Sequence, residues 1–170
     1  QTEHGPERYQ PGDARLVAAD GRRQRPGGEG IDRDGEGHPT DDPGGGATPP
    51  NLGIARLLVA RGHEVVVYGD PTLAADVAAT GAAHRAWPTA PQRRSTALDD
   101  DILKDWECRT ALGQVLRLRD RLIAGDAAPR FAADVVGALD AAAASAEPFD
   151  VVLADGVLLG ALVGAEARGI

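Results

Sequence analysis

Two short apolar runs constrain the fold of this chain more than any other feature of its sequence. Residues 65–68 read Val-Val-Val-Tyr, residues 149–154 contain Val-Val-Leu-Ala, and segments with helical spacing of apolar residues precede and follow both. A strand that is apolar on both faces is typical of a parallel sheet with helices packed on either side. The alternation therefore predicts an α/β fold built on a parallel, Rossmann-like sheet.

The same alternation gives the expected elements. Gly62 is expected to cap the first helix at its carboxyl end, and a polar loop is expected over residues 88–100. We expect helices over residues 50–61, 73–80, 102–107, 110–123, 128–145 and 157–168, and strands over residues 65–68, 82–87 and 149–154.

The first part of the chain has a different composition. Residues 1–50 contain 11 of the 22 Gly and 7 of the 12 Pro. Such a segment buries too little apolar surface to offset the entropy lost on ordering. We expect residues 1–43 to be a disordered Gly/Pro-rich segment, with residues 16–19 the only patch able to form a short strand. Residues 44–170 are expected to form the domain.

Both ends of the domain pattern are expected to be incomplete. A parallel sheet of this kind begins with a strand just before a Gly-rich turn, but residues 32–43 are too polar to form one. Ile170 stands where a further strand would begin. The sequence thus predicts part of a larger architecture.

Charge and cysteine content exclude several classes of protein. The chain has 18 Lys and Arg against 26 Asp and Glu, a net charge of −8, which argues against a nucleic-acid partner because phosphates are bound by clustered cations. The single Cys and the absence of a signal-like segment favour a reducing, cytoplasmic compartment. No apolar stretch approaches the roughly 20 residues of a membrane span.

Two short motifs suggest a cofactor or a metal, and neither fits. Gly44-Gly45-Gly46 with Asp70 suggests a dinucleotide site, but Pro49 and Pro50 occupy the later positions of that fingerprint. Asp99-x-Asp101 suggests a metal site, but it directly precedes an expected helix, whose amino terminus favours negative charge. The four His residues are scattered. No cofactor and no metal are therefore expected.

Several motifs in order carry a family resemblance. Residues 44–56, Gly-Gly-Gly-Ala-Thr-Pro-Pro-Asn-Leu-Gly-Ile-Ala-Arg, and residues 61–65, Arg-Gly-His-Glu-Val, resemble the amino-terminal half of two-Rossmann (GT-B) glycosyltransferases. The chain is most similar to actinobacterial-type UDP-glycosyltransferase-like members that act on natural products. The resemblance covers residues 44–170 and none of residues 1–43. It continues through Tyr68-Gly69-Asp70-Pro71, Leu103-Lys104-Asp105-Trp106-Glu107, Pro129-Arg130-Phe131-Ala132 and Asp150-Val151-Val152-Leu153-Ala154-Asp155.

The resemblance implies transfer of a sugar, with inversion, from a nucleotide-sugar co-substrate to a hydroxyl of a small-molecule acceptor. This chain would be the acceptor-binding half, and the donor domain would lie outside it, so the chain alone is expected to be inactive. The family's Gly-His-x-x-Pro turn aligns Gly46 with its Gly and Ala47 with its catalytic His. A methyl group cannot accept a proton. Asp155 matches the Asp that supports the His in the family's catalytic pair.

The resemblance and the sheet pattern together give the candidate site. In open parallel sheets ligands gather at the carboxyl ends of the strands. Two alternatives remain open: Asp155 either serves the acceptor or caps the helix beginning near Val157, and Trp106 either stacks on an acceptor ring or packs. The whole chain could also be a catalytically silent fragment or binding module. Asp155 is the catalytic candidate, and the substrate-binding candidates are Gly46, Thr48, Asp70 and Trp106.

Overall fold

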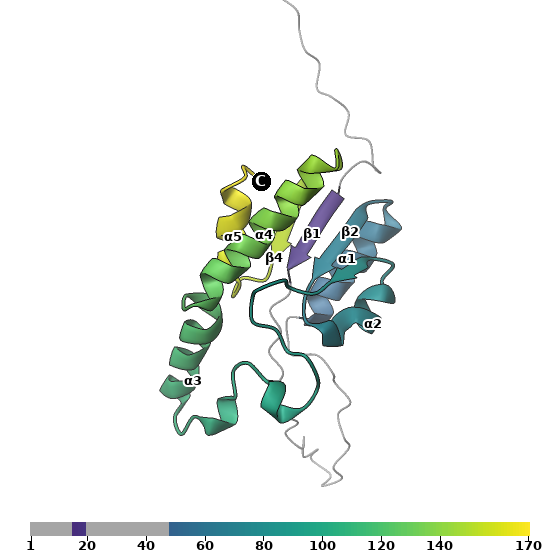
Figure 1. Ribbon diagram of the computed structural model, residues 1–170. Helices are drawn as coiled ribbons and strands as arrows, with labels where there is room; N and C mark the ends of the chain where they lie inside the picture. Colours follow the sequence, from purple (N-terminus) through teal and green to yellow (C-terminus); the bar gives the residue numbers. More distant parts are fainter. Residues whose placement is uncertain (1–14, 20–47) are drawn as a thin grey trace, which may run out of the picture.

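The structure, a computed structural model, describes residues 15–19 and 48–170 of the chain. It confirms an α/β fold in which helices alternate with parallel strands (Figure 1). The strands are β1 (Arg15–Ala19), β2 (Glu64–Tyr68), β3 (Ala83–Arg85) and β4 (Val151–Ala154). The helices are α1 (Thr48–Ala60), α2 (Ala74–Ala78), α3 (Ala111–Leu118), α4 (Ala127–Ala144) and α5 (Leu159–Glu166), with short turns η1 (Pro71–Leu73), η2 (Leu98–Asp100), η3 (Asp105–Glu107) and η4 (Arg119–Ile123).

The four strands form one parallel sheet in the order β3-β2-β1-β4. β1 lies in the middle, where Leu16 pairs with Val65 of β2 on one side and with Val151 of β4 on the other. β3 and β4 are the edge strands of the described sheet. All carboxyl ends therefore point to one edge of the sheet, the lower edge in Figure 1.

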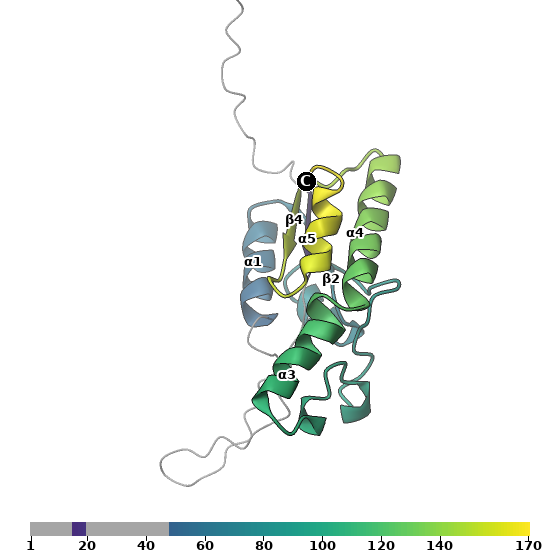
Figure 2. The same ribbon diagram turned by 90° about the vertical axis from the view of Figure 1, so that its left-hand side faces the viewer.

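Helices cover both faces of the sheet, with α1 on one side and α4 and α5 on the other (Figure 2). The packing of β2 explains why its residues 65–68 are apolar on both faces. Val65 and Val67 pack with Ala55 of α1 and with the α2 segment, whereas Val66 and Tyr68 pack with α4 and α5. These four residues are at most 5% exposed, whereas Glu64, the first residue of the strand, is exposed. The predicted burial of this strand on both faces is confirmed.

The first strand of the sheet lies where sequence reasoning did not expect the domain to extend. Residues 15–19 form β1, so the sheet is not lacking its first strand, and the expected domain boundary at residue 44 leaves this strand out. The patch at residues 16–19 was the only one in the segment predicted to be able to form a strand. It does so because two neighbouring strands supply its backbone hydrogen-bond partners. The remaining residues of the 1–43 segment lie outside the described residues.

The segment between β3 and α4 also differs from expectation. Residues 102–107 do not form a helix, because Lys104 has a left-handed backbone (φ 47°) and the Asp101 carboxylate accepts from the N–H groups of Leu103 (2.8 Å) and Lys104 (3.2 Å). The helix predicted over 110–123 ends as an α-helix at Leu118 and continues as the π-type turn η4.

α4 and α5 approach each other very closely. A Cβ atom added to Gly160 would lie 2.1 Å from the Ala128 carbonyl oxygen, and one added to Gly164 would lie 2.6 Å from that of Ala132. Glycine at these two positions therefore allows the backbones to meet. This contact fixes α5, and with it the turn that follows β4, against α4, the longest helix among the described residues.

Candidate functional site

The candidate site lies at the carboxyl edge of the sheet. Thr48 begins α1, Asp70 follows β2 and Asp155 follows β4, so all three stand at this edge. β1 separates β2 from β4. Because neighbouring strands lie about 4.8 Å apart, the strands that precede the two carboxylates are separated by about 10 Å. The parallel topology thus gathers residues that are more than 100 positions apart in the sequence.

Asp155 uses only one of its two carboxylate oxygens within the described structure. The Val157 N–H donates to Oδ1 (3.0 Å), and the Leu158 N–H donates to the backbone carbonyl of Asp155 (2.8 Å). Oδ2 is buried and has no hydrogen-bond partner among the described residues. A buried carboxylate oxygen without a partner is costly, so we expect a group outside the described residues, such as a water or a ligand hydroxyl, to satisfy it.

The helix-cap interpretation of Asp155 can be compared with this geometry. α5 begins at Leu159, and Leu158 is the residue in its N-cap position. Asp155 therefore holds the turn that precedes α5 rather than the first turn of the helix. This local role occupies Oδ1 and leaves Oδ2 available.

Thr48 presents a second buried oxygen at the same edge. Its side chain is 2% exposed, and Oγ1 has no hydrogen-bond partner among the described residues. The next two residues, Pro49 and Pro50, have no N–H group, so the amino terminus of α1 lacks two of the donors that such a terminus ordinarily offers. The Thr48 hydroxyl, which can both donate and accept, is the side-chain polar group at the start of this helix.

Asp70 is buried and hydrogen-bonded within the protein, which its position after a strand does not indicate. It is 7% exposed, and its Oδ1 accepts from the Arg93 backbone N–H (2.9 Å). His84 Nε2 lies 3.1 Å from the Asp70 carbonyl oxygen and donates to it, because a carbonyl can only accept. Asp70 therefore connects the loop after β3 to the carboxyl end of β2.

The loop after β3 is held by two further charged residues that sequence reasoning did not select. The Asp134 carboxylate accepts from the Thr89 N–H (2.9 Å), the Thr89 hydroxyl (2.7 Å) and the Ala90 N–H (2.8 Å). The Arg93 guanidinium donates to the carbonyls of Ser95 (2.8 Å) and Thr96 (2.7 Å). Asp134 could have been noticed in the sequence, because a charged residue beside Val135 on the apolar face of a helix needs buried partners. In the structure Asp134 is 6% exposed.

Trp106 lies on the segment that leads into α3, beyond the sheet edge, and is 43% exposed. Arg117 of α3 holds this segment, because it donates to the carbonyls of Leu103 (3.2 Å) and Lys104 (2.7 Å) and to Glu107 Oε2 (2.8 Å). The hydrogen bond with Glu107 raises the pKa of the Arg117 guanidinium. The indole is thus exposed on a segment fixed by backbone contacts.

Two of the candidate residues cannot be placed. Gly46 and Ala47 lie outside the described residues. Within residues 15–19 and 48–170, no three His, Cys, Asp or Glu side chains gather as a metal site would require. None of the helices in this part of the chain is long and apolar enough to cross a membrane.

Comparison with solved structures finds similar proteins, whereas the other two comparisons find none. No family model matches the chain, and no curated protein matches it. The chain is similar to a solved structure described as the glycotransferase of kitacinnamycin, with 25% sequence identity and a TM-score of 0.49. The match covers 95% of this chain and 29% of that chain. The sequence therefore spans less than a third of the length of that structure.

Proposed function

We propose that this chain is the acceptor-binding half of an inverting, nucleotide-sugar-dependent glycosyltransferase. The observation that carries the proposal is the buried, unpartnered Oδ2 of Asp155 at the carboxyl edge of a parallel sheet. That edge is where open α/β sheets bind ligands. The resemblance of residues 44–170 to two-Rossmann glycosyltransferases supports the choice of reaction.

The proposed chemistry is a single displacement at the anomeric carbon of the donor. The acceptor hydroxyl oxygen forms a bond to that carbon while the bond from the carbon to the nucleotide phosphate breaks, so the configuration inverts. The acceptor proton passes to Asp155 Oδ2, directly or through one water, because Ala47 has no group that can accept it. The Thr48 hydroxyl orients the acceptor. The donor nucleotide is bound by a second domain that is not part of these 170 residues.

The second candidate is a binding module without catalytic activity. Ala47 at the position of the family's base is the observation that favours it. A module of this kind would bind the acceptor at the same edge of the sheet. Its sugar transfer would rise little if a base were introduced, because it does not catalyse transfer. The two candidates therefore predict the same binding and differ in transfer.

A transfer assay on a form completed with a donor domain separates them. Ala47→His places an imidazole at the family's base position, and positioned general-base catalysis is typically worth about a hundredfold or more. We expect Ala47→His to raise transfer and expect Asp155→Asn to remove the gain, since an amide cannot stabilise an imidazolium in the same way. Asp140→Asn, an exposed carboxylate on α4, is the matched control. An equal gain with and without Asp155 would rule out its role.

A further inference from the structure

The two tryptophans of the chain have opposite surroundings. Trp87 is 2% exposed and packs with Tyr68 and Phe131, with ring centroids 5.4 and 5.0 Å apart. Trp106 is 43% exposed, and no aromatic ring among the described residues contacts it. An exposed indole offers a large apolar ring face on which a ligand can stack. Of the two interpretations of Trp106, packing is therefore the weaker one.

The backbone on both sides of Trp106 is fixed, although its side chain is exposed. Leu103 is 7% exposed and belongs to the main hydrophobic core, and Lys104 has a left-handed backbone (φ 47°, ψ 49°). The Cys108 N–H donates to the Asp105 carbonyl oxygen (3.0 Å), which closes the turn η3. A left-handed backbone at a residue other than Gly is strained, and such strain clusters at ligand-binding positions. The indole is thus presented by a fixed segment.

Arg117 of α3 makes the contacts that hold this segment. Its Nη1 donates to two carbonyl oxygens on the amino side of η3 (3.2 and 2.7 Å) and to Glu107 Oε2 (2.8 Å). The pKa of the guanidinium is raised, mainly by the hydrogen bond with Glu107 and also by the charge of Asp105. One side chain therefore contacts the chain both before and after Trp106.

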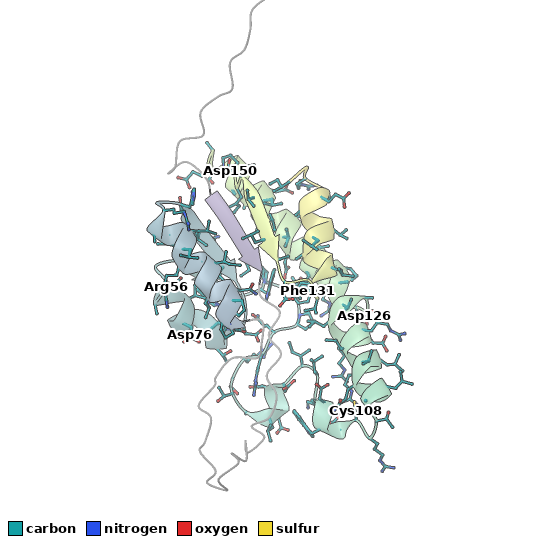
Figure 3. All side chains as sticks on the ribbon, turned by 180° about the vertical axis from the view of Figure 1, so that it is seen from behind. Arg56, Asp76, Cys108, Asp126, Phe131 and Asp150 are labelled. Carbon is teal, nitrogen blue, oxygen red and sulfur yellow. The ribbon has the colours of Figure 1, made fainter. Side chains whose placement is uncertain are left out.

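The segment lies at the same end of the molecule as the candidate site. η3 and α3 come after the carboxyl end of β3, and Figure 3 shows Cys108, directly after η3, beyond the carboxyl ends of the strands. Asp150, directly before β4, lies at the opposite end of the sheet. An acceptor whose hydroxyl is bound at Asp155 can therefore extend toward Trp106.

We propose that the acceptor carries an aromatic ring that stacks on Trp106, and that Arg117 is the positioning residue that fixes Trp106 for this contact. The inference rests on the proposed function, because the hydroxyl of the same acceptor is bound at Asp155. Two aromatic rings in contact gain stability beyond the area that they bury. A fixed aromatic side chain also loses little conformational entropy on binding. The site thus favours an aromatic ring over a saturated ring of similar size.

Alcohols that differ only in their ring test the proposal. ω-Phenylalkanols of increasing chain length and ω-cyclohexylalkanols of equal length are added to the 170-residue chain, and binding is followed by NMR at the backbone amides and indole N–H groups. The chain has two Trp, so the indole signal lost in Trp106→Leu identifies Trp106. At the length that reaches Trp106, we expect the phenyl compound to bind about two- to tenfold more tightly and to shift this indole signal.

Variants separate the stacking residue from the positioning residue. Trp106→Leu should abolish the preference for phenyl compounds while binding at the carboxyl edge persists. Arg117→Gln should reduce the preference and move the Trp106 indole signal, whereas Arg117→Lys should retain most of it, since an ammonium can donate to the same carbonyl oxygens. Arg117→Gln should change the preference no further in the Trp106→Leu background, because Arg117 acts through Trp106. Arg119→Gln is the matched control, since Arg119 follows α3 and pairs with the adjacent Asp120.

The outcomes distinguish this inference from the proposed function. Equal affinities for phenyl and cyclohexyl alcohols at every length, or a preference that survives Trp106→Leu, would overturn the stacking and leave the carboxyl-edge site in place. Trp106→Leu provides this test even if Arg117→Gln fails to fold. A preference reduced as much by Arg119→Gln as by Arg117→Gln would overturn the positioning role. Amide shifts that avoid Thr48 and residues 155–158 for every alcohol would overturn the proposed acceptor site and this inference with it.

Discussion

β2 and β4 have nearly the same kind of sequence and very different surroundings. Each has a run of apolar residues on both faces, yet the side chains of Val65 and Val67 are 3% exposed, whereas those of Val151 and Leu153 are 38–39% exposed. β2 lies between β1 and β3 and has helices on both faces, whereas β4 is an edge strand covered on one face. The comparison teaches that an all-apolar run predicts a strand, whereas the burial of that strand depends on which elements lie beside it and on each face of the sheet.

The largest contrast is expected between truncating a large side chain in the buried core and truncating one on β4. Phe131 is 2% exposed and packs edge-to-face on Trp87, with ring centroids 5.0 Å apart. Phe131→Ala should cost about 3–5 kcal/mol of unfolding free energy, because it leaves a cavity in the core. Leu153→Ala should cost about 1–2 kcal/mol, since 38% of the residue is already in contact with water. Urea unfolding at low protein concentration measures both, and equal losses would contradict the comparison.

A second contrast separates the α4–α5 contact from the exposed side of α4. Gly160→Ala adds a methyl group where the Ala128 carbonyl oxygen lies 2.1 Å away, so the helices must shift and the loss should be about 1–3 kcal/mol. Gly137→Ala on α4 meets nothing within 4 Å and should stabilise the protein by about 0.5–1 kcal/mol through helix propensity. Thermal unfolding of the two variants should move the midpoint in opposite directions. A Gly160→Ala variant as stable as the parent would show that α4 and α5 are farther apart.

The loop after β3 depends on a buried carboxylate of α4, that of Asp134. Asp134→Asn replaces an oxygen that accepts from Thr89 and Ala90 with an amide donor, or weakens the Thr89 hydroxyl bond if the amide turns around. We expect a loss of about 1.5–3 kcal/mol, the usual range for a hydrogen bond to a charged group. Hydrogen exchange should accelerate at the amides of residues 89, 90 and 93. Acceleration confined to α4 would contradict a loop-holding role.

The smallest effect is expected at an exposed ion pair between α4 and the end of α5. Arg168 donates to Asp140 at 2.6 and 2.8 Å, and this hydrogen bond lowers the pKa of the Asp140 carboxyl. A carboxyl whose pKa is lowered by folding stabilises the protein above its unfolded pKa, and the contribution is lost as pH falls through the folded pKa. Arg168→Gln should therefore reduce stability slightly at neutral pH and not at all at strongly acidic pH. Urea unfolding of the parent and the variant at both pH values measures this loss. An equal loss of stability at the two pH values would contradict the prediction.

Most of the fold follows from residue patterns. The periodicity of residues 128–145 predicted α4, and the all-apolar runs predicted β2 and β4, because burial on both faces leaves a clear signal. The sequence did not place β1 within the sheet, because Arg-Leu-Val-Ala-Ala stands alone within a Gly- and Pro-rich segment. It gains its strand structure from its two neighbours, β2 and β4. Residues 102–107 have the composition of a helix, but the Asp101 side chain and Arg117 take the backbone groups that a helix would use.

The candidate site was predictable only in part. Asp155 and Thr48 were selected from a resemblance, and topology places them at one edge. Asp70 was selected for the same reason, yet its carboxylate accepts from the Arg93 backbone, a partner that no local pattern indicates. Such long-range hydrogen bonds depend on how loops fold back over the sheet, which periodicity does not describe.

The most direct test of the proposed acceptor site is a map of acceptor binding on the chain itself. Backbone amide shifts in solution would be followed while small hydroxylated aromatic compounds are added to the protein and to Asp155→Asn. We predict shifts that cluster at Thr48, Asn51 and residues 155–158, and at least a tenfold weaker affinity in the variant, as expected when a hydrogen bond to a charged group is lost. Shifts that cluster away from the carboxyl edge, or an affinity unchanged by Asp155→Asn, would contradict the proposed acceptor site.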